Sequence, residues 1–270
     1  MVRFVFIAIF CVVLNANDML QEKIQNILGE SSYNRNIKFI NKIFSNQARF
    51  YKNGALDIYQ VIFTLQTNGL LKLKFKNPQE FNIIFIAETS PIFLLRTINR
   101  SLASMGYSYW TTNEASYKEN ISKLTISLET EHIVDPVALL NELQKNGFVS
   151  VSVLREADNK WEYKLFVRDS KIPDSRFISK GNAISIAEVA GEYWLELGSF
   201  DGRLQISTRN NRSFNPSIVF FDKDLNILDV KNLSRRANVN INVVKNTKFV
   251  KIKDSISSFN INSGIDIRFK

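Results

Sequence analysis

The sequence predicts an α+β protein made of three consecutive blocks: N-terminal helices, a mixed α+β block and a C-terminal antiparallel β-sandwich. Apolar residues recur at helical spacing in the first block, helical and strand patterns alternate in the second, and the apolar period falls to two in the third. The 270 residues are 45% apolar and 12% aromatic. This composition supports a packed core, and the length suits one large domain or two ordinary ones.

Residues 1–16 have the layout of a secretory signal peptide. Arg3 provides a positive start, the run from Phe4 to Leu14 is apolar and uncharged, and Leu14-Asn15-Ala16 offers a cleavage point. The apolar run is too short for a permanent membrane anchor. We therefore predict an exported, periplasmic protein that is cleaved near Ala16. The alternative is an uncleaved anchor, because Leu14 is larger than the residue usual at that position.

Cleavage would leave 254 residues without a cysteine, because Cys11 lies in the predicted signal. An exported chain without thiols cannot form disulfides, and this fits a bacterial periplasm. The formal net charge is +9, and +8 once Arg3 is removed. A basic exported protein meets anionic lipid, acidic wall polymers and acidic protein surfaces, so we expect no nucleic-acid partner. Solubility alone is the alternative explanation of the charge.

Residues 17–54 are predicted to form an N-terminal helical segment. One amphipathic helix is expected to stop at Gly29, and a second to run from about Asn34 to Tyr51. The second helix is basic, and a basic amphipathic helix can lie on an anionic membrane surface. The preferred alternative is an ordinary helix that packs its apolar stripe on the domain behind it. The candidate contacts with an anionic surface are Arg35, Lys38, Lys42, Arg49 and Lys52.

Residues 55–168 are predicted to form an α+β domain with a weak internal repeat. Three helical stretches each end in a glycine followed by an apolar residue, at Gly69, Gly106 and Gly147. Glycine just past a helix end takes the left-handed conformation that closes the last carbonyl groups. Ser90-Pro91 and Asp135-Pro136 mark helix starts. The expected strands are Leu70–Phe75, Phe81–Glu88, Tyr107–Thr112, Ile121–Glu131, Phe148–Leu154 and Trp161–Val167.

From Phe81 onward the order is strand, helix, strand, strand, helix, strand. This is the ferredoxin-like split β-α-β order, preceded by one extra helix–strand unit and followed by one extra strand. The same order resembles the SPOR-type fold, which binds peptidoglycan strands. That resemblance implies a glycan ligand for this block.

A polar, turn-rich stretch at residues 169–182 is the predicted linker, and residues 183–270 are the predicted β-sandwich domain. Short strands at close spacing with no helix between them are typical of an antiparallel sandwich. Turns are expected at Asp201-Gly202, Asp222–Asn226 and Ser263-Gly264. The expected strands are Ala183–Val189, Tyr193–Leu197, Arg203–Thr208, Ser217–Phe221, Ile227–Val230, Val239–Val243, Phe249–Lys253 and Ile265–Phe269.

The strand pattern at the start of this last block resembles the bacterial pre-peptidase C-terminal type of β-sandwich. The run Gly191-Glu192-Tyr193-Trp194-Leu195 is followed by Leu204–Ser207 and then by Ser217–Asp224. The resemblance covers about a third of the chain and rests on strand pattern rather than on functional residues. It implies an accessory, non-catalytic module and no particular substrate.

We expect no enzyme activity, no cofactor and no metal. His132 is the single histidine, and no second histidine or free thiol exists in the mature chain to complete a transition-metal site or a nucleophile pair. Asp222–Asn226 copies the start of a calcium loop, but Ile227 and Leu233 stand where that loop needs glycine and glutamate. No nucleophile elbow, phosphate loop or dinucleotide motif occurs. The alternative that the sequence leaves open is a pair of carboxylates for glycoside hydrolysis that converge from distant strands.

Binding through aromatic side chains is the more plausible chemistry, because aromatic faces stack on sugar rings or grip a partner's side chains. Burial in the core is the preferred alternative for these residues, as it is for Tyr193 and Trp194. Lys245, Lys248, Lys251 and Lys253 are expected to protect an edge strand rather than form a polyanion groove. The candidate partner or glycan contacts are Tyr109, Trp110, Trp161 and Tyr163.

Two functions follow as expectations. The first is a non-catalytic periplasmic structural or assembly protein of a bacterial envelope machine (a flagellar motor, pilus or secretion apparatus) that acts through protein–protein contacts. The alternative is a periplasmic protein that binds peptidoglycan or another glycan. The expected partners are therefore other envelope proteins, peptidoglycan or an anionic membrane surface.

Overall fold

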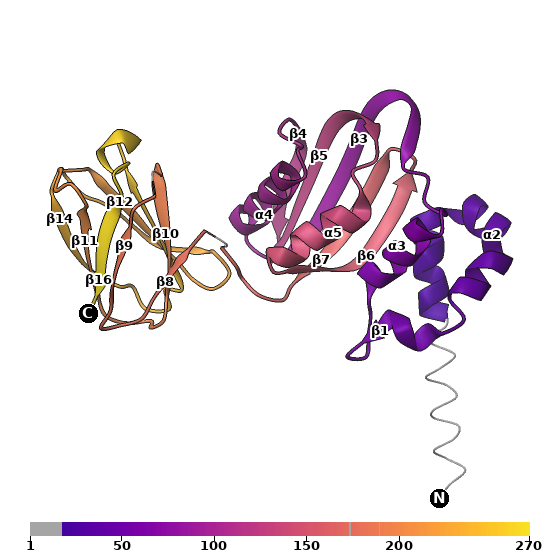
Figure 1. Cartoon of the computed structure of the whole chain (residues 1–270), viewed down its shortest axis with the longest axis horizontal. Coiled ribbons are helices and arrows are strands. Elements are labelled where there is room, and N and C mark those ends of the chain that lie inside the picture. The colour runs from indigo at the N-terminus through magenta and orange to yellow at the C-terminus, as the bar shows by residue number, and fades with distance from the viewer. Residues whose placement is uncertain (1–17, 173, 189) are drawn as a thin grey trace, which may run out of the picture. The chain divides into compact units, whose positions relative to one another are not determined.

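The computed structural model describes residues 18–172, 174–188 and 190–270. The chain divides into two compact units, Met1–Asp169 and Ser170–Lys270. Helices accompany a large sheet in the first unit, and the second unit is almost entirely sheet (Figure 1). The α+β class is therefore confirmed. The predicted signal peptide lies outside the described residues, and within those residues no helix has the length and apolar character needed to cross a membrane.

The N-terminal helices reverse the chain before the large sheet begins. The prediction of one helix from Asn34 to Tyr51 is wrong at both ends, because that helix starts directly after Gly29 and stops at Ile43. Phe44 and Phe50 then pack at 4.6 Å in the core, and burial of both rings turns the chain back. The elements are a helix over residues 18–28, α2 (Glu30–Ile43), η1 (Gln47–Phe50), β1 (Tyr51–Lys52), β2 (Ala55–Leu56) and α3 (Ile58–Thr67).

One five-stranded sheet organises the rest of the first unit, in the order β4-β5-β3-β7-β6. β3 and β7 are parallel, and the other neighbours are antiparallel. A four-stranded ferredoxin-like sheet would place the strand after α5 beside β3, but here β7 lies between β6 and β3. The elements are β3 (Lys74–Glu88), α4 (Pro91–Ser104), β4 (Thr111–Lys118), β5 (Ile121–His132), α5 (Pro136–Lys145), β6 (Phe148–Ala157) and β7 (Lys160–Val167).

Local signals in the sequence fix the helix ends. Ser90 and Asp135 cap α4 and α5, and each side chain accepts a hydrogen bond from a backbone N–H in the first turn. Gly69, Gly106 and Gly147 follow α3, α4 and α5 with φ angles of 71°, 89° and 88°. The predicted left-handed glycines are therefore present at all three helix ends.

Two strand predictions in this unit are wrong. The separate strand Leu70–Phe75 does not exist, because β3 begins only at Lys74 and continues through an irregular segment to Glu88. The strand Tyr107–Thr112 is displaced, since β4 begins at Thr111. In both cases a coil follows the glycine before the strand starts.

The core of the first unit lies between the sheet and the helices α4 and α5, which cover one face of the sheet (Figure 1). Alternate residues of β3 and β7 point into this core, among them Phe85 and Tyr163, whose rings lie 5.7 Å apart. Phe93 of α4 meets Phe148 of β6 edge to face at 4.9 Å. Burial of these aromatic rings explains why the helices pack on this face.

The second unit contains two sheets, in the orders β13-β12-β15-β10-β8 and β14-β11-β16-β9. The prediction that residues 169–182 are a linker needs correction, because Arg176–Ile178 within this stretch forms β8, the first strand of the unit. This strand pairs in parallel with β10, and Ile178 is 1% exposed. The remaining strands are β9 (Ala183–Ile186), β10 (Glu192–Leu197), β11 (Arg203–Thr208), β12 (Pro216–Phe221), β13 (Ile227–Asn232), β14 (Asn238–Asn242), β15 (Phe249–Asp254) and β16 (Ile265–Phe269).

Candidate functional site

The strand β4 is the most exposed regular element of the first unit. All eight residues from Thr111 to Lys118 are exposed. β4 pairs with β5 along one edge, and among the described residues it has no strand neighbour along the other. Tyr109, just before the strand, is 92% exposed, and Tyr117 within it is 50% exposed. An open edge of this kind presents backbone donors and acceptors to a partner.

Side-chain contacts on the β5 side hold β4 in place. The register shifts between Thr112 and Glu114, so Asn113 sits in a bulge. Its side chain donates a hydrogen bond to Asn82 at 3.0 Å and accepts one from Ser127 at 3.1 Å. The hydroxyl groups of Thr111 and Ser127 lie 2.7 Å apart. The strand is therefore anchored by its bulge, and regular backbone follows from Glu114 onward.

An ion pair neutralises the acidic residue of this strand. Lys123 of β5 donates a hydrogen bond to Glu114 at 2.8 Å. This bond is the main reason why the pKa of Glu114 lies below its ordinary value, and the charges of Lys123 and Lys160 and a hydrogen bond from Thr125 act in the same direction. Glu114 stays ionised, and its charge is balanced on the sheet itself.

The four predicted aromatic contacts fall into two groups. Tyr109 is exposed and Trp110 is partly exposed, so both are accessible next to β4. Trp161 and Tyr163 are fully buried on β7, with their rings 6.4 Å apart. A buried ring cannot stack on a glycan, so Trp161 and Tyr163 are corrected as candidate contacts, and the preferred interpretation of core burial applies to both. The alternating pattern of β7 does not tell which of its two faces is exposed. In the structure, α4 and α5 cover the face that carries Trp161 and Tyr163.

The predicted basic contacts are all exposed. Arg35, Lys38 and Lys42 recur at helical spacing on α2, and Phe39, 42% exposed, lies on the same face. Arg49 and Lys52 follow on η1 and β1. None of the five basic residues forms an ion pair with an acid in the described part of the chain. The structure thus places these cations at the surface, while the apolar residues Ile40 and Phe44 are buried.

Tyr193 and Trp194 of β10, like Trp161, are largely buried. Trp194 stacks on Phe221 at 5.2 Å, and the ammonium of Lys251 lies 5.5 Å from its ring centre. Lys251 also pairs with Glu192 at 2.5 Å, so this lysine belongs to the sheet surface around Trp194. Lys248 similarly pairs with Glu196 at 2.7 Å. Local contacts therefore engage two of the four clustered lysines.

The two metal-like sequence patterns have structural roles. His132 ends β5, where its N–H donates a hydrogen bond to the side chain of Thr130 at 3.1 Å. The carboxylate of Asp222 accepts hydrogen bonds from the backbone N–H groups of Asp224 and Asn226, at 2.8 and 2.9 Å. These bonds close the turn between β12 and β13. No group of three metal-ligating side chains gathers in the described residues.

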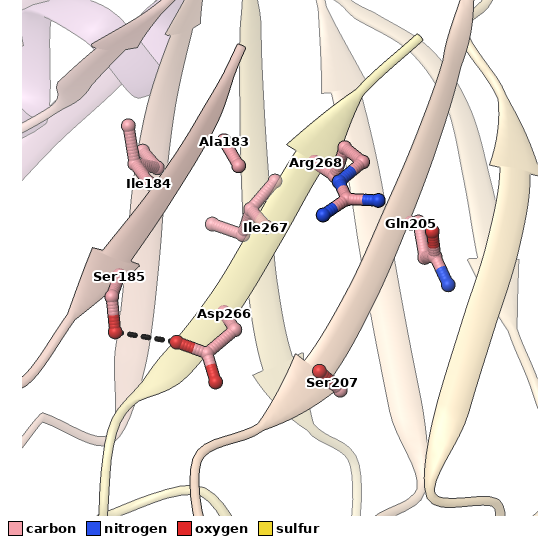
Figure 2. A pocket seen from close by; sticks show the side chains of 8 residues that line it. All are labelled: Ala183, Ile184, Ser185, Gln205, Ser207, Asp266, Ile267 and Arg268. Atoms are coloured by element: carbon pink, nitrogen blue, oxygen red, sulfur yellow. Dashed lines mark hydrogen bonds between the residues drawn. The ribbon is translucent and has the colours of Figure 1, made fainter.

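A shallow polar cavity of about 450 Å³ lies on the outer face of the β14-β11-β16-β9 sheet (Figure 2). Gln205 and Ser207 of β11 face Arg268 and Asp266 of β16 across the strand pair. Ser185 of β9 donates a hydrogen bond to the carboxylate of Asp266. None of these residues was predicted from the sequence as a contact. Their alternation with Ile184, Leu204, Ile206 and Ile267 could have identified them as an outward face.

A second cavity, whose residues were also not predicted from the sequence, lies in the first unit and has a volume of about 560 Å³. Its lining includes Lys72, Lys74 and Lys76 together with Arg155 of β6. The alternating sequence Leu71-Lys72-Leu73-Lys74-Phe75-Lys76 is a readable signal for a basic face. Arg155 lies 79 residues beyond Lys76, so its convergence on the same cavity follows only from the fold.

No family model matches this sequence, and no curated protein matches it. Among solved structures, the chain is similar to the pre-peptidase C-terminal domain of a collagenase from Bacillus anthracis. The match covers 38% of this chain and 100% of that domain, at 10% sequence identity and a TM-score of 0.26. A likeness at this level says nothing about what this chain binds.

Proposed function

We propose that this protein is a non-catalytic binding protein of the bacterial envelope, which holds a partner protein by accepting one of its strands at the edge of β4. The observation that carries the proposal is the open edge of an anchored strand whose eight residues are all exposed. In strand addition, backbone hydrogen bonds supply affinity and alternate side chains supply specificity. The envelope setting rests on the signal-like sequence of residues 1–16.

The other edge of the same sheet supports the choice of β4. The edge strand β6 contacts the helices α3 and α5, and Ser152 of β6 accepts a hydrogen bond from Lys23 at 3.4 Å. Helices therefore flank one edge of the sheet and leave the β4 edge open. The exposed Tyr109 and Tyr117 add aromatic area where a partner strand would lie. This arrangement suits a structural or assembly protein of a flagellar motor, pilus or secretion apparatus.

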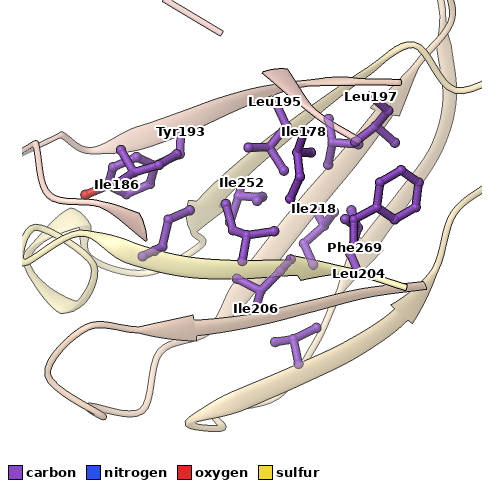
Figure 3. Close-up of a cluster of buried hydrophobic side chains, with 14 of the residues drawn as sticks. Ile178, Ile186, Tyr193, Leu195, Leu197, Leu204, Ile206, Ile218, Ile252 and Phe269 are labelled. Carbon is purple, nitrogen blue, oxygen red and sulfur yellow. The ribbon is translucent and has the colours of Figure 1, made fainter. Parts of the chain in front are cut away.

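We infer a specific sheet architecture for each of the two units. The first sheet is a split β-α-β arrangement with β7 inserted beside β3, and the second unit is a β-sandwich. The second inference is supported by the buried cluster in Figure 3, where Leu195 and Ile218 of one sheet lie near Leu204 and Ile206 of the other. Shared burial of this kind is what two face-to-face sheets require.

Photo-crosslinking in the living cell tests strand addition. A photo-reactive residue replacing Tyr117 is expected to give a discrete protein adduct, and the double variant T112K/S116K is expected to abolish it, because charges on an edge strand block pairing. The matched variant N238K/N240K places the same charges on the exposed edge strand β14 and should leave the adduct unchanged. In the purified complex, the β4 amides that point away from β5, which have no strand partner in the free protein, should exchange more slowly than they do in the free protein. An adduct that survives T112K/S116K, or amides that all exchange at the free rate, contradicts the proposal.

Glycan binding is the second candidate, and the polar cavity of Figure 2 favours it. Amide, hydroxyl, carboxylate and guanidinium groups converge there from Gln205, Ser207, Asp266 and Arg268. Such groups match the paired donors and acceptors of sugar hydroxyls. Retention on purified cell-wall sacculi tests this function. We expect Q205A/R268A to lose retention and N238A/N240A on the neighbouring β14 to keep it. Equal retention of both variants excludes a glycan site at this cavity.

A further inference from the structure

An irregularity in β3 forms one wall of the lysine-lined cavity of the first unit. Lys74 pairs with His132 of β5, and the next paired residue, Gln79, lies opposite Thr130. Residues 75–78 therefore face a single β5 residue and bulge outward. Phe75, 8% exposed, packs against Phe81 at 6.1 Å and ties the bulge to the core. Phe75 therefore attaches the bulge to the packed core, and Lys74 precedes the bulge while Lys76 lies within it.

The turn between β6 and β7 also lines the cavity, and hydrogen bonds attach this turn to β3. Asn159 donates a side-chain hydrogen bond to the carbonyl of Glu80 at 3.0 Å, and its own carbonyl accepts one from the N–H of Asn82 at 2.8 Å. The side chain of Arg155 is 10% exposed, and its guanidinium lies 5.6 Å from the ring centre of Trp161. Contacts within the chain therefore attach both the bulge and this turn to the first unit.

The charges around the cavity are unbalanced. Its lining contains the cations Lys72, Lys74, Lys76 and Arg155 and a single acid, Asp158. Asp158 pairs with Arg155 at 2.9 Å through one guanidinium nitrogen. Across residues 18–172, 174–188 and 190–270, no acid forms an ion pair with any of the three lysines. Clustered cations repel one another, and a bound anion would relieve that repulsion.

We propose that this cavity binds a small soluble molecule carrying two or more phosphate charges. A volume of about 560 Å³ is in the range of small-molecule sites. The lysine ammonium groups act as compact positive charges for phosphate oxygens, and the guanidinium of Arg155 offers planar N–H donors. The concave shape selects a small ligand over the phosphate headgroups of a flat bilayer. None of the residues that line this cavity belongs to β4, so a negative result for phosphate binding would not affect the proposal of strand addition.

Calorimetric titration of the full chain with inorganic pyrophosphate tests the proposal. The triple variant K72Q/K74Q/K76Q is expected to bind at least about tenfold more weakly than the unmodified chain, because three charge contacts are lost. The matched variant K245Q/K253Q/K270Q removes three exposed lysines of the second unit and should bind within about twofold of the unmodified chain. Equal weakening in both variants, or none in the first, overturns the site.

A second measurement uses the unmodified chain and does not depend on how a variant folds. Pyrophosphate is expected to protect Lys72, Lys74 and Lys76 from acetylation, read by mass spectrometry, and to leave Lys245 reactive.

Flotation with phosphatidylglycerol vesicles distinguishes a soluble phosphate ligand from the phosphate headgroups of a membrane. We expect K72Q/K74Q/K76Q to float as the unmodified chain does. Unprotected lysines, or vesicle binding that depends on these three residues while pyrophosphate does not bind, contradict the proposal.

Discussion

The carboxylate of Asp254 accepts a hydrogen bond from the backbone N–H of Asn215 at 2.9 Å, across 39 residues of chain. The same carboxylate accepts bonds from the N–H groups of Ile256 and Ser257, at 2.7 and 2.8 Å, and from the side-chain amide of Asn260 at 2.9 Å. Burial alone would raise the pKa of Asp254, but these four bonds outweigh it and hold the pKa below its ordinary value. One buried side chain thus joins the start of β12 to the loop after β15.

Replacing Asp254 with asparagine is expected to destabilise the second unit by about 1–3 kcal/mol at neutral pH, because asparagine has a single acceptor oxygen and two of the four N–H donors therefore lose their acceptor. The depressed pKa means that the carboxylate stabilises the fold above the ordinary aspartate pKa of about 4, and that this contribution disappears as the pH falls through the lower folded pKa. Asp254→Asn should therefore show a weaker acid dependence. Urea unfolding followed by the fluorescence of Trp194, the one tryptophan in this unit, measures both effects.

Asp229→Asn is the matched control for this prediction. A hydrogen bond from Lys231 is the main reason why the pKa of Asp229 is also lowered, but this carboxylate lies at the surface of β13. Solvent screens such a pair, so the unfolding midpoint should stay close to that of the unmodified chain. Equal effects of the two substitutions would contradict the special role of Asp254.

Gly147→Ala is expected to be much more damaging than Gly106→Ala, although both glycines end helices at nearly the same φ, 88° and 89°. A Cβ at position 147 would lie 1.7 Å from the carbonyl oxygen of Asp169, whereas one at position 106 meets nothing within 4 Å. Gly106→Ala should cost only the left-handed strain of about 1–2 kcal/mol. Gly147→Ala should cost about 2 kcal/mol more, because the chain must move. Urea unfolding measures the loss of stability in both variants. Equal losses would contradict the predicted clash at position 147.

Tyr163→Phe is expected to leave the stability of the first unit unchanged or to raise it by about 1 kcal/mol. The phenol oxygen of Tyr163 is buried, and within the described residues it has no hydrogen-bond partner. Removing an unsatisfied buried polar atom relieves a desolvation cost. Thermal unfolding measures the change, with Tyr109→Phe at the exposed position as the control. A loss of stability would show that the hydroxyl has a partner.

The same tyrosine predicts an alkaline effect. Burial, and to a smaller extent the charge of Asp135, raises the pKa of Tyr163 well above its ordinary value of about 10. The folded state therefore keeps this phenol protonated where the unfolded state ionises, so stability present below about pH 10 is lost as the pH rises beyond it. Tyr163→Phe should lose less stability over that range, as measured by urea unfolding at increasing pH.

Asp135→Ala is expected to destabilise the first unit by about 2 kcal/mol, because one carboxylate makes two hydrogen bonds. Asp135 accepts a bond from the N–H of Ala138 at 2.9 Å and another from the side chain of Gln66 at 2.7 Å. It therefore joins α3 to α5 as well as capping α5. A double-mutant cycle with Gln66→Ala should give a coupling energy of about 1 kcal/mol. Additive effects would mean that the Gln66 contact contributes nothing.

Local sequence signals predicted the starts of α4 and α5 and the C-terminal ends of α3, α4 and α5, because each of these signals rests on bonds made within one turn. Ser90, Asp135 and the three glycines act within a few residues of their own position, so no knowledge of the fold is needed. The bounds of β3, by contrast, were not predicted by local signals. Its bulge at residues 75–78 interrupts the alternation, and the segment therefore looked like the end of one strand and the start of another.

The candidate sites were harder to predict, because a strand pattern shows that two faces exist but not which face is covered. Trp161 and Tyr163 looked like partner contacts, yet they are core residues. Lys72, Lys74 and Lys76 could be read as one basic face, but their meeting with Arg155 depends on β7 lying beside β3. That arrangement joins residues far apart in the chain, and no local pattern encodes it.

The parallel pairing of β8 with β10 has a practical consequence for preparing the second unit as an isolated fragment. A fragment that begins at residue 183, at the edge of the polar stretch, would omit Arg176–Ile178. It would remove Ile178 from the hydrophobic interior and leave the backbone of Leu195, Glu196 and Leu197 unpaired on that side. A fragment beginning at Ser170 retains this strand and is the better choice for expression, crystallisation and binding assays.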